Sequence, residues 1–105
     1  MSLSTHVLDA VRGEPAAGIR VRLYRESALS AELATDADGR IREAFPQLEM
    51  GVYRLVFETG DYFAARDAEC FYPEVAVCFA VSDPRRHYHV PLLLSPFAYS
   101  TYRGS

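Results

Sequence analysis

Three histidines are the residues of this chain best suited to acid–base chemistry, and they lie near its two ends. His6 stands in the first segment, whereas His87 and His89 are separated by one residue in the last quarter of the chain. Alternate side chains of a β-strand share a face, so His87 and His89 are predicted to point the same way, about 6.6 Å apart. Tyr88 and Val90 then face the core, and the imidazoles lie on a polar sheet face.

Histidines in this pattern suit two kinds of site. One is a zinc centre in which His6, His87 and His89 hold the metal, which lowers the pKa of a bound water. The other is a metal-free site in which a neutral imidazole takes a proton from water and a fixed cation stabilises the oxyanion. No neighbouring carboxylate is an evident partner for a zinc-bound imidazole. We therefore favour the metal-free site.

Arg40 is the candidate for the fixed cation. It directly follows Asp38-Gly39, a strong turn signal, and begins a segment with strand character. A guanidinium keeps its charge and holds a carbonyl or ring edge with its planar fork. A calcium loop over the same aspartates is rejected because Ala34 and Phe45 would stand at its first and last ligand positions.

The last eleven residues keep strand character almost to Ser105, where most chains become polar and frayed. A final strand explains Phe97 to Tyr102 but not Arg103-Gly104-Ser105. Gly104 would let the backbone bend. We therefore expect the Ser105 hydroxyl and its carboxylate to enter the site.

The chain has 105 residues and a mass of 11.8 kDa, which supports one core and predicts a single domain over residues 1–105. Half of the residues are hydrophobic, and seven Tyr and six Phe add packable surface, which excludes disorder. Fourteen carboxylates outnumber eleven arginines for a net charge of -3. We therefore expect binding to neither nucleic acid nor an anionic membrane.

The longest apolar run, Val75 to Val81, is too short for a membrane span, and the N-terminal segment has no signal-peptide pattern. A cytoplasmic protein is expected. Cys70 and Cys78 do not have the spacing of a metal or redox motif. Cys78 lies in the apolar run and is predicted to be a buried small hydrophobe, so no disulfide is expected.

Short segments of alternating polarity separated by turn residues predict an all-β fold, a two-sheet sandwich of about eight strands with one short helix. The expected strands are 3–9, 18–25, 31–35, 40–44, 52–58, 75–81, 87–94 and 98–102, and the helix follows Gly60 over 61–68. The turn signals are Gly13-Glu14-Pro15, Asp38-Gly39, Pro46, Gly51, Asp83-Pro84 and Ser95-Pro96.

Three segments together resemble the 5-hydroxyisourate hydrolases, the enzymatic branch of the transthyretin family. They are Leu3-Ser-Thr-His-Val-Leu-Asp9, Thr35-Asp-Ala-Asp-Gly-Arg40 and the long segment from His87-Tyr-His89 to Tyr102-Arg-Gly-Ser105. The resemblance covers the whole chain, and its terminal tetrapeptide separates the hydrolases from the hormone-carrying transthyretins. One departure is Ala98, where many members have Gly.

The resemblance implies hydrolysis of 5-hydroxyisourate, the unstable product of urate oxidation, without a cofactor. It also implies a homotetramer with sites in the cleft between two dimers. Which histidine is the base stays open, and a non-catalytic small-molecule binding protein of the transthyretin type is the alternative. The implied catalytic residues are His6, Arg40, His89 and Ser105, the implied substrate-binding residues are Arg40, Tyr102, Arg103 and Ser105, and His87 is a neighbour.

Overall fold

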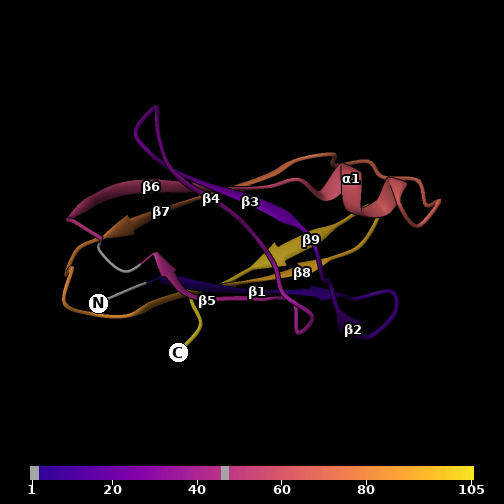
Figure 1. Ribbon diagram of the computed structural model, residues 1–105, viewed down its shortest axis with the longest axis horizontal. Helices are drawn as coiled ribbons and strands as arrows, with labels where there is room; N and C mark the ends of the chain where they lie inside the picture. The colour runs from indigo at the N-terminus through magenta and orange to yellow at the C-terminus, as the bar shows by residue number, and fades with distance from the viewer. Residues whose placement is uncertain (1–2, 46–47) are drawn as a thin grey trace.

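The computed structural model describes residues 3–45 and 48–105, so the turn expected at Pro46 lies outside the described residues. Two sheets pack face to face, and one short helix closes an end of the sandwich (Figure 1). This arrangement confirms the predicted two-sheet sandwich. The elements are β1 (Leu3–Asp9), β2 (Glu14–Pro15), β3 (Arg20–Arg25), β4 (Ala28–Ala34), β5 (Arg40–Phe45), β6 (Gly51–Phe57), α1 (Thr59–Ala64), β7 (Val75–Val81), β8 (Tyr88–Leu94) and β9 (Tyr99–Thr101).

The strand β1 organises the sheet that bears the histidines. It runs parallel to β8 on one side, while on the other side it pairs antiparallel with β5 near its start and with β2 near its end. Beyond β8 lies β9, so segments from both ends of the sequence lie side by side in this sheet. The second sheet has the strand order β4-β3-β6-β7.

Alternation in β1 divides its side chains between core and surface as the sequence predicts. Leu3, Thr5 and Val7 are buried, while Ser4 and His6 are half-buried on the outer face. Apolar residues of both sheets fill the space between them, and each fully buried Leu or Phe contributes roughly 1.5–3 kcal/mol. This packing fixes which face of β1 carries the imidazole.

Besides small shifts in the limits of several strands, two details of the elements differ from the sequence prediction. The turn expected at residues 13–15 contains the two-residue strand β2. The helix begins at Thr59 rather than residue 61, because the Thr59 hydroxyl and the Gly60 N–H donate to the carbonyls of Tyr72 and Pro73. It ends at Ala64, and Asp67 then turns the chain with a φ of 56°.

The prediction that Cys78 is buried is wrong. Among the described strands β7 pairs with β6 alone, and its outward residues Ala76, Cys78 and Ala80 are exposed. Only the alternate residues, such as Val75 and Val81, reach the core. An apolar run is therefore not buried on both faces when one face of its antiparallel sheet is open to solvent. Both Cys70 and Cys78 are free thiols.

None of the helices in the described part of the chain has the length and apolar character that a bilayer span requires.

Candidate active site

Neighbouring segments of one sheet bring the expected site residues onto its outer face. In order across the sheet these are β5 with Arg40, β1 with Ser4 and His6, β8 with His89, and the tail with Gly104 and Ser105. An open cavity of about 400 Å³ lies over this face. Its lining residues are Ser4, Thr5, Arg40, Ile41, Arg42, His87, His89 and Ser105.

Arg40 is positioned by a loop that Asp36 closes. The Asp36 carboxylate accepts hydrogen bonds from the backbone N–H groups of Asp38 and Arg40, both at 2.9 Å. The Gly39 carbonyl accepts from Val7 N–H at 2.7 Å, which joins the loop to β1. Gly39 has a φ of 73°, a conformation that favours glycine. The turn predicted before Arg40 is therefore confirmed.

The carboxylates of Asp36 and Asp38 interact with other groups of the protein. Hydrogen bonds from the loop backbone, chiefly from Arg40, lower the pKa of Asp36. Arg42 lies within 3.9 Å of the Asp36 carboxylate and 3.3 Å of the Asp38 carboxylate. The aspartates thus hold the loop and orient Arg42.

His6 lies directly opposite Arg40 in the β1–β5 register. Burial lowers the pKa of His6 and the Arg40 charge lowers it further, while the Asp38 backbone acts in the opposite direction. Burial also lowers the pKa of His89, with added contributions from Arg40, His87 and His6. The lowered pKa values favour the neutral form of both imidazoles at pH 7, which is the form that accepts a proton.

Ser4 joins the two histidines of β8, a contact that sequence analysis missed. Its Oγ lies 2.7 Å from His89 Nδ1 and 2.8 Å from His87 Nε2. In the parallel β1–β8 register Ser4 is the direct partner of His89. The shared face of Ser4 and His6 is readable from alternation, but the parallel pairing that brings Ser4 to His89 has no local sequence signal.

The tail is held against His89. Gly104 N–H donates to the His89 carbonyl at 2.8 Å, and the two residues form an isolated antiparallel bridge. A Cβ on Gly104 would lie 2.5 Å from His89 Cδ2 and 3.1 Å from Pro91 Cγ. Gly104 thus permits close approach to the imidazole, and Ser105 follows into the cavity.

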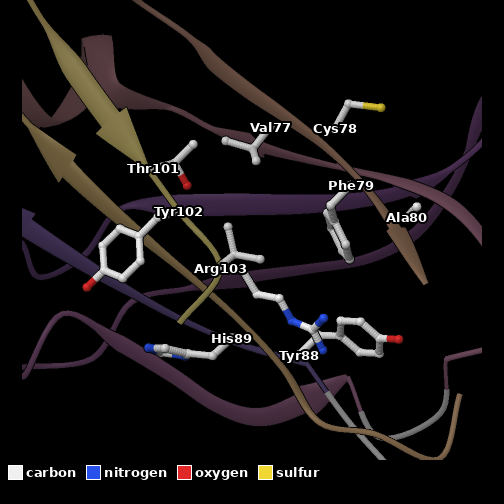
Figure 2. A pocket seen from close by; sticks show the side chains of 10 residues that line it. Val77, Cys78, Phe79, Ala80, Tyr88, His89, Thr101, Tyr102 and Arg103 are labelled. Atoms are coloured by element: carbon white, nitrogen blue, oxygen red, sulfur yellow. The ribbon is translucent and has the colours of Figure 1, made fainter. Parts of the chain in front are cut away.

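Tyr102 and Arg103 line a second cavity rather than the first. This cavity, of about 320 Å³, lies between β7 and the β8–tail edge, and His89 borders both cavities. The Arg103 guanidinium lies over the Tyr88 ring, 4.6 Å from its centroid. In Figure 2 the two groups lie together, and the His89 imidazole points away from them. Arg103 therefore anchors the tail to β8 by a cation–π contact.

A tri-imidazole metal site was the other chemistry that the histidines suggested. Within the ranges that the structure describes, no three His, Cys, Asp or Glu side chains are grouped so as to hold a metal ion.

Comparisons with known proteins give a consistent result. A model of the HIUase/Transthyretin family matches residues 3–104. A 5-hydroxyisourate hydrolase of Caulobacter vibrioides is 49% identical over 112 residues, which cover 98% of this chain and 97% of that protein. The solved 5-hydroxyisourate hydrolase of Klebsiella pneumoniae has a TM-score of 0.91 and 43% identity, covering 100% of both chains. Sea bream transthyretin in complex with thyroxine has a TM-score of 0.92 and 33% identity, covering 99% of this chain and 95% of that one.

Proposed function

The chain belongs to the HIUase/transthyretin family, and we propose that it hydrolyses 5-hydroxyisourate in urate degradation. Water opens the six-membered ring at its amide bond to give 2-oxo-4-hydroxy-4-carboxy-5-ureidoimidazoline. The observation that carries this proposal is the meeting of Arg40, His89 and Ser105 around one cavity beside His6. These groups come from distant parts of the sequence, yet they surround a space fit for a small purine-derived ring.

Each group has a role that its surroundings suit. His6 and His89 have lowered pKa values, so a neutral imidazole of this pair can take a proton from water and return it to the leaving ring nitrogen. Arg40 polarises the carbonyl under attack and stabilises the oxyanion through its fixed charge. Ser105 contacts the substrate from the tail side, Arg103 holds the tail against Tyr88, and Tyr102 lines the second cavity beside it. No step requires a cofactor.

The alternative is a binding protein of the transthyretin type. The fold alone does not separate the two, because sea bream transthyretin superposes as well as the Klebsiella hydrolase. A carrier has no use for two neutral imidazoles beside an arginine, nor for a tail inserted against one of them. The higher identity to the hydrolases also favours catalysis.

The site is further proposed to be completed by a second copy of the chain. The cavity is open, and one sheet face forms only one wall of a pocket. A homotetramer in which two dimers meet across this face would supply the opposite wall by two-fold symmetry. Light scattering at several protein concentrations measures the assembly.

The free thiols Cys70 and Cys78 are consistent with a reducing, cytoplasmic location.

The function is tested by adding the protein to urate that a separate uricase is oxidising. Absorbance follows the intermediate, whose decay should accelerate in proportion to the protein added. Activity should persist after exhaustive chelation, with no stoichiometric zinc by elemental analysis. Decay at the spontaneous rate would favour the binding protein, and loss of activity on chelation that zinc restores would favour the metal site at His6, His87 and His89.

A further inference from the structure

The Ser4 hydroxyl stands between two imidazoles, and its hydrogen-bonding capacity restricts both. A hydroxyl has one proton to donate and two lone pairs to accept with. Ser4 Oγ is within 2.8 Å of both His89 Nδ1 and His87 Nε2, so it can donate to only one of them. The second nitrogen must therefore carry a proton and donate it to Ser4 Oγ. The protonation state of each ring is thus linked to that of the other.

The surroundings favour one arrangement of these protons. His89 is half-buried and faces His6 of β1 and Arg40 of β5, with Arg42 and Ser105 also lining the cavity. A positive charge on His89 is therefore disfavoured by lost hydration and by a neighbouring cation. His87 precedes β8 and is exposed, so water can stabilise a charge there.

We propose that Ser4 is a positioning residue and proton relay that makes His89 the general base and passes the positive charge to His87. This inference rests on the proposed hydrolysis. In the resting state Ser4 donates to His87 Nε2, and His89 donates its Nδ1 proton to Ser4. The Nε2 lone pair of His89 is then free to accept a proton from water.

Each proton of the relay passes from one named group to the next. As the water oxygen bonds to the substrate carbonyl carbon, one water proton moves to His89 Nε2. The His89 Nδ1 proton passes to Ser4 Oγ, and the Ser4 proton passes to His87 Nε2. His89 stays neutral and His87 becomes the cation. When the ring C–N bond breaks, His89 Nε2–H protonates the leaving nitrogen and the relay runs backward, restoring all three groups.

This arrangement also gives His87 a role that its position alone does not suggest. A neutral imidazole beside Arg40 is a good acceptor only if the charge that it gains can leave. The relay moves this charge to His87 through the two hydrogen bonds of Ser4 Oγ, which are 2.8 Å or shorter.

The state of His89 is measured first, without substrate. Nitrogen NMR of protein labelled with ¹⁵N-histidine should find His89 protonated at Nδ1 and unprotonated at Nε2 at neutral pH. Ser4→Ala should lose this single tautomer, and Ser4→Thr should keep it. A His89 protonated at Nε2 in the wild-type protein, or a tautomer unchanged in Ser4→Ala, would overturn the proposal. This readout needs no turnover, so it stands apart from any failure of the proposed function.

Kinetics then test the relay. Ser4→Ala should lower kcat about tenfold, in line with one lost hydrogen bond, while Ser4→Thr retains most of it. His87→Gln keeps a hydrogen-bonding group of similar reach but cannot take up the proton, so its kcat should also fall. A variant that carries both Ser4→Ala and His87→Gln should be no slower than Ser4→Ala alone, because both changes interrupt the same relay. Ser30→Ala, an exposed serine of β4 in the other sheet, is the matched control. Additive losses, or an unchanged Ser4→Ala, would contradict the relay.

Discussion

Gly104 and His89 approach so closely that a side chain at residue 104 has no room. A Cβ there would lie 2.5 Å from the imidazole Cδ2, closer than carbon atoms approach in folded proteins. The backbone of the same two residues is joined by a hydrogen bond of 2.8 Å. The tail and the imidazole are therefore placed by one another, and neither can move without the other.

Gly104→Ala should lower kcat/KM at least about tenfold, because a displacement of the imidazole or the tail near 1 Å is costly to catalysis. Thermal unfolding should change little, since the tail is a small part of the fold. Gly60→Ala is the matched control: its Cβ would also be crowded, at 3.0 Å from the Pro73 carbonyl, but far from the cavity. That variant should lose stability and keep its activity when folded. Wild-type kinetics in Gly104→Ala would show that the close approach has no catalytic importance.

His6→Asn and His89→Asn should each lower the rate by at least about a hundredfold, at the lower end of the cost of losing a general acid or base. Asparagine keeps hydrogen bonding but cannot take up a proton near neutral pH. Steady-state kinetics measure the loss, and light scattering checks that assembly is unchanged. A variant with near-native turnover would remove its histidine from the mechanism.

Arg40→Lys should reduce kcat about a hundredfold or more, the range for losing a donor to an oxyanion. Lysine keeps the charge but lacks the planar fork. Arg20→Lys, on the other sheet, serves as the control and should retain full activity. Full activity in Arg40→Lys would reduce Arg40 to a turn residue.

The rate should hold as pH falls to about 6.5, the ordinary histidine value, and decline only at lower pH. The reason is that the neutral imidazoles are the active forms, and burial with Arg40 lowers the pKa values of His6 and His89. Proton NMR titration of both rings measures the shift directly. Arg40→Gln should raise both pKa values, because it removes a neighbouring positive charge. Histidines that titrate at or above 6.5 in the wild-type protein would contradict this electrostatic interpretation.

Removing residues 103–105, or appending a tag after Ser105, should sharply lower activity, whereas an equal tag before Met1 should be tolerated better. Truncation removes the Gly104–His89 bridge and the contact of Arg103 with Tyr88, and a tag adds bulk beside the cavity that Ser105 lines. The uricase-coupled assay compares the three proteins. Unchanged turnover in a C-terminally tagged protein of native assembly would deny the tail a catalytic role.

Local alternation predicted much of the sheet structure. The limits of β1 and β7 were predicted to the residue, because each has a buried alternate face bounded by clear turn or proline signals. Arg40 was correctly placed after its turn, since Asp-Gly turns depend on nearby residues. The exposure of Cys78 was missed because an apolar run does not show which face of its sheet is open to solvent.

The assembly of the candidate site was predictable only in part. Period-two alternation predicted that His87 and His89 share one face of the sheet. Both imidazoles contact the Ser4 hydroxyl, which agrees with a shared face. Strand order, however, is a long-range property, so the pairing of Ser4 with His89 could not be read from neighbours in sequence. The separation of Tyr102 and Arg103 into a second cavity has the same origin, because it follows from where the tail crosses β8.

The parallel pairing of β1 with β8 also determines when the site can exist during folding. Thr5 donates to the Val90 carbonyl across a separation of 85 residues, and Ser4 meets His89 across the same interval. Contacts of such separation carry a large loop-closure cost and form late. During synthesis the N-terminal strand must therefore wait for almost the whole chain before its β8 edge is filled. We therefore expect catalytic competence only in chains in which the pairing of β1 with β8 has formed.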